Sequence, residues 1–174
     1  MAKQALDELT KVVPRSITDA GVSRRSAGAP AGGRASGRRV VDLLGQVPLF
    51  AGLSRRQLRR LADHTDTAYF RQGETIVESG QPGGTFYVIL EGAAKVVRGR
   101  RTIDRMEPGD FFGEISLLDG GPRTASVIAE TPVSAIRVFK RSFDRLVSHE
   151  PAVAAEILAV VAGRLRQAER SLTC

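Results

Sequence analysis

The chain has 174 residues, of which 42% are apolar and 26% are charged, the composition of one soluble globular domain with additional segments. Its apolar runs fall far short of the roughly 18 residues that a membrane-spanning helix needs, so we expect no transmembrane segment. The single cysteine, Cys174, excludes an intrachain disulfide and a thiolate metal cluster.

The formal net charge of +7 is concentrated near the N-terminus. Residues 1–40 hold eight basic and three acidic residues, whereas the other 134 residues hold 18 basic and 16 acidic ones. Most of the chain is therefore close to neutral, which gives little support for a basic nucleic-acid-binding face on its folded part.

We expect residues 1–39 to form a flexible basic segment. Apolar residues three and four positions apart predict a short amphipathic helix at 2–13. Residues 21–39 consist mainly of Gly, Ala, Ser, Pro and Arg, and they carry too little apolar surface to offset the entropy of ordering. A solvated tail is the simplest interpretation. An arm that contacts nucleic acid, anionic lipid or an acidic partner is the alternative.

Two short helices are expected after residue 40. Pro48 interrupts the first, and Ser54 can cap the second, which ends near His64. The predicted buried residues of the two helices are Val40, Val41, Leu43, Leu44, Val47, Leu58 and Leu61. The four arginines between residues 55 and 60 are then expected to face water.

The stretch from residue 67 to residue 139 has the pattern of an all-β unit. Short apolar, β-branched or aromatic runs alternate there with glycine and proline. The predicted strands are 67–70, 75–78, 85–90, 93–98, 101–105, 111–112, 124–129 and 133–139. Eight short strands at this spacing predict a jelly roll or a similar double-sheet barrel.

Helical patterning returns after residue 139. A short helix is expected around Phe143 and Leu146, and Pro151 opens a last helix of about 152–171. The apolar face of this last helix is predicted to carry Val153, Ile157, Val160, Val161, Leu165 and Leu172. Packing against the barrel, a lid and a dimer seam are all open interpretations of that face.

The candidate chemistry lies in residues 108–127, PGDFFGEISLLDGGPRTASV. The first N–H groups of a short helix starting near Glu114 would point toward a ligand phosphate, and Arg123 could add a planar guanidinium to that phosphate. A carboxylate repels phosphate, so Glu114 makes sense as the acceptor of a hydrogen bond from a neighbouring sugar hydroxyl. The segment therefore predicts a phosphorylated ribose as ligand.

This segment closely resembles the phosphate-binding cassette of the cyclic-nucleotide-binding domain family, which includes the catabolite activator protein and the protein kinase A regulatory subunits. The sequences FGEISL at 112–117 and PRTA at 122–125 match the family pattern. The resemblance covers about 40–172 and implies an α+β fold. In that fold an eight-stranded β-roll, a double-stranded β-helix or jelly roll, lies between N-terminal helices and two C-terminal helices at 140–172.

The resemblance implies that Glu114 binds the ribose 2′-hydroxyl and that Arg123 binds the exocyclic oxygens of the cyclic phosphate. The remaining residues of the implied cradle are Gly113, Ile115, Ser116, Thr124 and Ala125. The alternative is that Glu114 and Arg123 pair only with each other in an empty roll.

Cyclic AMP is the expected ligand and cyclic GMP the alternative. A threonine after the cassette arginine, as Thr124 here, accompanies cyclic GMP in eukaryotic kinases of the family, but bacterial members with Ser or Thr there bind cyclic AMP. The excess of arginine over lysine, 22 to 4, is typical of a GC-rich bacterial genome.

The expected function is that of a stand-alone cytoplasmic receptor that signals to a protein partner by moving its C-terminal helices when the nucleotide binds. A homodimer through the last helix is a further expectation. DNA binding is not expected, because no helix-turn-helix follows the last helix before Cys174. A ligand-free interaction module, and binding of nucleic acid or an acidic partner through the N-terminal arm, remain the alternatives.

An enzyme is not expected, because no nucleophile and base stand at a sensible spacing. The two histidines, His64 and His149, are far apart in sequence and have no cysteine beside them, so we predict surface or helix-end positions for both. No catalytic residue, metal or cofactor is therefore predicted.

Overall fold

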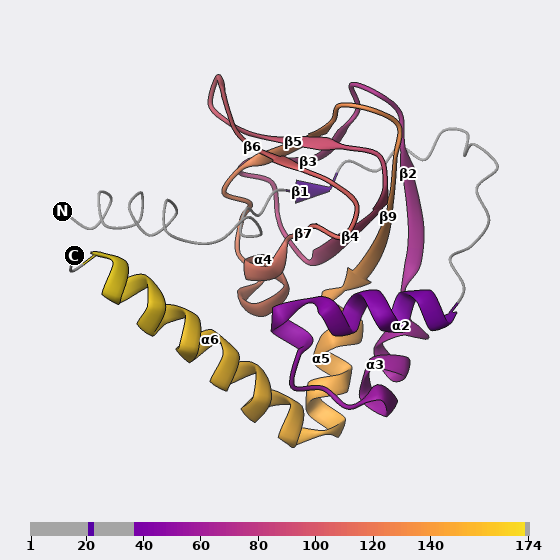
Figure 1. Cartoon of the computed structure of the whole chain (residues 1–174), viewed down its shortest axis with the longest axis vertical. Coiled ribbons are helices and arrows are strands. Elements are labelled where there is room, and N and C mark those ends of the chain that lie inside the picture. Colours follow the sequence, from indigo (N-terminus) through magenta and orange to yellow (C-terminus); the bar gives the residue numbers. More distant parts are fainter. Residues whose placement is uncertain (1–20, 23–36, 173–174) are drawn as a thin grey trace.

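A computed structural model describes residues 21–22 and 37–172 of the chain, with side chains described for residues 37–163 and for Arg166. Two antiparallel sheets form a β-roll, and most of the helices gather at one end of it (Figure 1). One sheet has the strand order β1-β3-β8-β5-β6 and the other β2-β9-β4-β7. The strands are β1 Gly21–Val22, β2 Asp66–Phe70, β3 Thr75–Glu78, β4 Thr85–Glu91, β5 Ala94–Arg98, β6 Arg101–Met106, β7 Phe111–Phe112, β8 Ser126–Ala129 and β9 Val133–Phe139.

The eight predicted strands are confirmed as β2 to β9, with boundaries within two residues of the prediction. The central strand β4 reads as a continuous apolar run because both of its faces are covered. Its alternate side chains Phe86 and Val88 enter a core shared with the helices, whereas Tyr87 and Ile89 enter the interior of the roll. The four-stranded sheet therefore separates the interior of the roll from the helical layer.

The helices are α2 Gly37–Gln46, the 3₁₀ turn η1 Pro48–Phe50, α3 Arg55–Ala62, α4 Glu114–Asp119, α5 Lys140–His149 and α6 Pro151–Leu172. The predicted start of α3 is confirmed. Ser54 Oγ accepts a hydrogen bond from the Gln57 main-chain N–H at 3.3 Å, and Gln57 Oε1 accepts one from the Ser54 N–H at 2.8 Å. The predicted buried residues of α2 and α3 are confirmed except for Leu43, which is half-buried.

The basic N-terminal segment departs from its prediction at two places. Gly21 and Val22 form β1, which pairs with Glu78 and Val77 of β3, and α2 already begins at Gly37. The boundary expected at residue 40 is therefore three residues too late. The pairing of β1 with β3 was not predictable, because it depends on hydrogen bonds of the backbone with a distant strand. The helix expected at 2–13 lies outside the described residues.

The last helix packs on the rest of the molecule through its first turns. Of the expected apolar face, Val153 and Ile157 are buried, Val160 is half-buried, and Val161 is 37% exposed. The described side chains do not include Leu165 or Leu172. In the described part of the chain no single helix is long and apolar enough to span a membrane. Taken together, α5 and α6 as far as Gly163 are long and apolar enough, but the chain bends by 115° between them.

Candidate ligand-binding site

The cassette begins where β7 ends. Phe112 pairs with Tyr87 of β4, and the two rings stack with centroids 4.8 Å apart. The chain then turns at Gly113, whose φ of +90° favours glycine, and α4 starts at Glu114 as predicted. A Cβ atom at Gly113 would lie 2.5 Å from the Thr85 oxygen and 2.9 Å from Arg123 Nη1. The backbone at Gly113 therefore approaches both β4 and the cassette guanidinium as closely as glycine allows.

Arg123 lies in the loop that follows α4 and is held at both its backbone and its side chain. Its N–H donates to the Gln81 oxygen at 3.0 Å, and its own oxygen accepts from the Gly80 N–H at 2.8 Å. Its Nη2 donates to the Thr85 oxygen at 2.9 Å. These bonds fix the position of a guanidinium that is only 2% exposed.

Glu114 and Arg123 are both charged and both buried, with 4% and 2% of their surface exposed. Two of their buried polar atoms, Glu114 Oε2 and Arg123 Nε, make no hydrogen bond within the described residues, although each side chain has other interactions. Removing two charges from water costs free energy that a buried pair often fails to recover. The burial of these two charged side chains is therefore weak evidence for a stabilising role.

Two glycine-rich segments, 80–84 and 120–123, pack against each other and against α4. Ser116 Oγ donates to the Gly121 oxygen at 3.0 Å, and the Gly83 N–H donates to the same oxygen at 3.2 Å. A Cβ atom at Gly83 would lie 1.9 Å from Ser116 Oγ, so only glycine fits there. Ser116 therefore ties α4 to the loop before Arg123.

The structure brings five of the seven predicted site residues together as buried positions, which are Gly113, Glu114, Ser116, Arg123 and Ala125. Ile115, with 38% of its surface exposed, and Thr124 are exposed. Ala125 packs into the core inside the roll. The binding roles of all seven stay predictions.

Thr85 and Tyr87 lie beside the predicted cassette residues but were missed by sequence reasoning. Thr85 acts through its main-chain oxygen, which leaves no signal in the sequence. Tyr87 lies inside the roll, where burial raises the pKa of its phenol to about 12, although Arg123 and Arg137 act to lower it. Its hydroxyl is therefore protonated at neutral pH and can donate a hydrogen bond.

Comparison with known proteins identifies the family of this site. Residues 67–150 match the family described as the cyclic nucleotide-binding domain. The solved N-terminal domain of a transcriptional regulator from Streptomyces coelicolor A3(2) is 34% identical and superposes with a TM-score of 0.67, over 72% of this chain and 94% of that domain. The chain belongs to the cyclic nucleotide-binding domain family.

Curated relatives carry the same domain within longer proteins. The CRP-like cAMP-activated global transcriptional regulator of Mycobacterium tuberculosis is 30% identical over 138 residues, which are 75% of this chain and 61% of that protein. The cAMP-dependent protein kinase regulatory subunit of Hypocrea atroviridis is 35% identical over 109 residues, 63% of this chain and 24% of that protein. This cyclic nucleotide-binding domain thus matches one quarter to three fifths of the length of these regulatory proteins.

Proposed function

We propose that the chain is a cytoplasmic receptor for a cyclic nucleotide, cyclic AMP in the first place, and that it binds this ligand without turnover. The observation that carries the proposal is the buried carboxylate of Glu114 together with the buried guanidinium of Arg123 in a cassette built around Gly113. The two curated relatives described above are named for cyclic AMP, which supports adenine over guanine as the base of the ligand.

The cassette supplies complementary groups to the two halves of a cyclic ribose phosphate. The Glu114 carboxylate accepts a hydrogen bond from the ribose 2′-hydroxyl, and the Arg123 guanidinium donates to the phosphate oxygens. Main-chain N–H groups at Gly113, Ile115 and Ser116, together with Thr124 and Ala125, complete the cradle. These are donor and acceptor roles, and none of them requires a nucleophile, metal or cofactor.

The signal then passes to the C-terminal helices through Lys140, the first residue of α5. Its ammonium contacts two main-chain oxygens at the end of α4, and its N–H donates to the Gly84 oxygen at 2.8 Å. A ligand that holds α4 in one position therefore favours one position of α5 and α6, which changes the surface offered to a protein partner.

A second copy of the chain is the partner that we expect to bind α6. Leu158 is 67% exposed and Val161 is 37% exposed on this helix, so both leave apolar surface in water. Sedimentation velocity on the parent and on Leu158→Lys tests this proposal. A dimer that the substitution dissociates is expected, and a parent chain that sediments as a monomer at all concentrations would contradict it.

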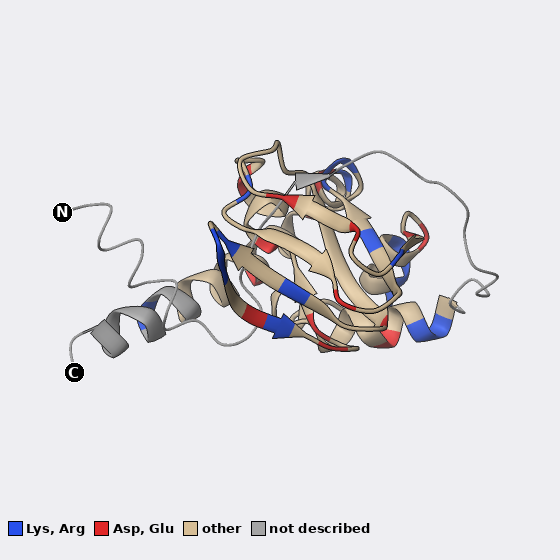
Figure 2. Cartoon of the chain, turned by 90° about the horizontal axis from the view of Figure 1, so that it is seen from above, with Lys and Arg blue, Asp and Glu red and all other residues tan. Residues whose placement is uncertain are grey.

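Isothermal titration with cyclic AMP and cyclic GMP tests the receptor itself. We expect micromolar or tighter binding of cyclic AMP that Arg123→Ala abolishes and that Arg59→Ala, which removes an exposed arginine of α3, leaves unchanged. Absence of binding by both nucleotides would instead favour the ligand-free interaction module. Nucleic-acid binding is a weaker alternative for the folded part, where basic and acidic residues are interspersed along the ribbon (Figure 2).

A further inference from the structure

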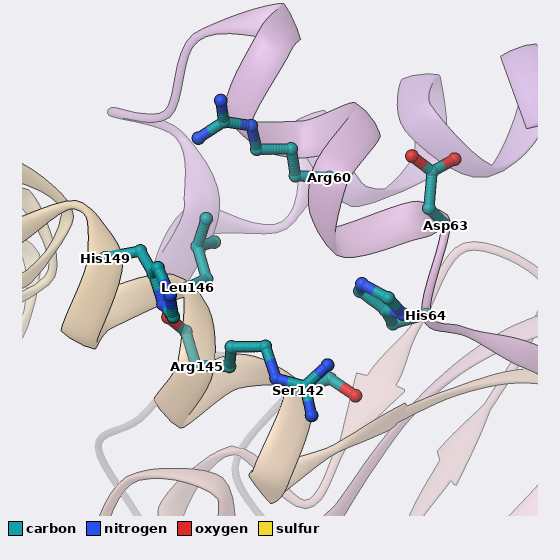
Figure 3. A pocket seen from close by; sticks show the side chains of 7 residues that line it. All are labelled: Arg60, Asp63, His64, Ser142, Arg145, Leu146 and His149. Carbon is teal, nitrogen blue, oxygen red and sulfur yellow. The ribbon is translucent and has the colours of Figure 1, made fainter.

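A groove separate from the cassette lies between the end of α3 and the helix α5. A cavity of about 330 Å³ is lined by Arg60, Asp63, His64, Ser142, Arg145, Leu146 and His149 (Figure 3). An adjoining cavity of about 240 Å³ is lined by His64, Thr65, Asp66, Phe139, Arg141, Ser142 and Arg145. The two cavities share His64, Ser142 and Arg145, so they lie next to each other, and together they are called the groove here.

The groove carries positive charge that the described residues do not neutralise. Within the described residues, neither Arg141 nor Arg145 forms an ion pair. The guanidinium of Arg141 lies over the Phe139 ring, 5.5 Å from its centroid, which restrains it at the groove. Two arginines that line one cavity without carboxylate partners favour an anionic ligand.

The carboxylates near the groove do not cancel this charge. Asp66 is bound by Arg137 through two hydrogen bonds of 2.6 and 2.7 Å, and Glu150 is bound by Arg60. Asp63 lines the larger cavity, but its carboxylate points away from His64 and Arg145 (Figure 3). The centre of the groove is therefore cationic.

The donors of the groove converge on the space between the two helices. The His64 ring and the Arg145 side chain come from opposite walls, and Ser142 lies beside the Arg145 guanidinium (Figure 3). On the α5 side, His149 Nδ1 contacts the Arg145 oxygen at 2.8 Å, which orients that ring. Guanidinium forks and a hydroxyl match the several oxygens of one phosphate group.

We propose that this groove binds a small phosphate monoester. The phosphate carries a charge of about −1.5 to −2 near neutral pH and lies between Arg141, Arg145 and Ser142. The Leu146 and Phe139 side chains provide apolar surface for the organic group of the ester. A ligand that contacts α5 and His64 together would brace α5 against α3, at a place that the cassette does not occupy.

Histidine ring NMR tests this proposal directly, because the chain has two histidines and both line the groove. Phenyl phosphate and inorganic phosphate, titrated at constant ionic strength into the full chain, serve as probes. We expect a saturable shift of the His64 ring signal with phenyl phosphate and weaker binding of inorganic phosphate. The shift is also expected in Arg123→Ala, which excludes binding at the cassette as its cause.

Matched arginine variants decide whether the groove is the site. Arg145→Ala and Arg141→Ala are each expected to weaken phenyl phosphate binding about tenfold, whereas Arg59→Ala leaves it unchanged. All three side chains are exposed, so unchanged melting temperatures are expected to show that the variants fold. A His64 signal that never saturates, equal affinity for the two probes, or an equal loss in Arg59→Ala would each overturn the proposal.

Discussion

Lys140 donates from its ammonium to the main-chain oxygen of Leu117 at 3.2 Å, so the first residue of α5 is bonded to the last part of α4. The same ammonium lies 3.4 Å from the Leu118 oxygen and 3.0 Å from Asp144 Oδ1. It occupies the C-terminal end of α4, where a positive charge interacts favourably with unpaired carbonyl groups. The cassette and the C-terminal helices are thus joined by a direct polar contact.

Replacing Lys140 with methionine should separate nucleotide binding from the response of α5. The substitution keeps the packing of the aliphatic chain and removes the charge, so we expect cyclic AMP affinity to change by less than about threefold and stability to fall by about 1 kcal/mol. Hydrogen exchange of residues 140–150 is then expected to lose most of its response to cyclic AMP. Lys95→Met in β5 is the control, and an equal response in Lys140→Met would contradict this coupling.

Gly113 is predicted to tolerate no side chain. Gly113→Ala combines left-handed strain with a Cβ atom 2.5 Å from the Thr85 oxygen, and we expect it to cost about 3 kcal/mol or more of unfolding free energy. Gly73→Ala is a matched control, because φ is +80° there but nothing lies within 4 Å of the new atom. It should cost about 1–2 kcal/mol. Urea denaturation measures both values, and equal costs would show that close packing at Gly113 is unimportant.

Two neighbouring residues of α6 should differ sharply in their contribution to stability. Ile157 is 5% exposed in the core shared with the helices, whereas Leu158 is 67% exposed. We expect Ile157→Ala to lower the unfolding free energy by about 2–5 kcal/mol and Leu158→Ala to change it by less than about 0.5 kcal/mol at low protein concentration. Chemical denaturation of the two variants measures both changes in unfolding free energy. A larger loss in Leu158→Ala than in Ile157→Ala would mean that α6 packs through its other face.

The contact between α3 and Glu150 is predicted to weaken in acid. A hydrogen bond from Gln57 Nε2, at 2.9 Å, and then the charge of Arg60 hold the pKa of Glu150 below its ordinary value of 4.5. The unfolded chain therefore binds more protons near that pH than the folded chain does. The stabilising contribution of Glu150 is fully present above pH 4.5, and it is lost as the pH falls through the lower pKa that Glu150 has in the folded state. Urea denaturation between about pH 3 and pH 6 should show a weaker pH dependence in Glu150→Gln than in the parent. Identical profiles would contradict the assignment.

The strands were predictable because glycine and proline mark their ends and because β4 is a nearly continuous apolar run. The cassette was predictable for a different reason. Gly113, Glu114 and Arg123 lie within one short segment, so their spacing along the chain nearly determines their spacing in the folded molecule.

The contacts that could not be predicted join segments far apart in the sequence. The bond from Arg123 to the Thr85 oxygen spans 38 residues and uses a backbone atom that any residue type would provide. The shared cavity of His64 and His149 depends on how α5 packs against α3, which neither helix encodes alone. Which residues of α6 are buried could not be predicted either, because its first half, as far as Ala162, is rich in apolar residues and does not distinguish one face by composition.

The bend between α5 and α6 gives the long helix the geometry of a lever. Its 22 residues span about 33 Å, and its first turns are anchored through Val153 and Ile157 (Figure 1). A rotation of about 10° at Glu150 would displace the far end sideways by about 6 Å. A small angular change at Glu150 would therefore appear, at the far end of α6, as a sideways displacement large enough to change its contacts with a neighbouring surface.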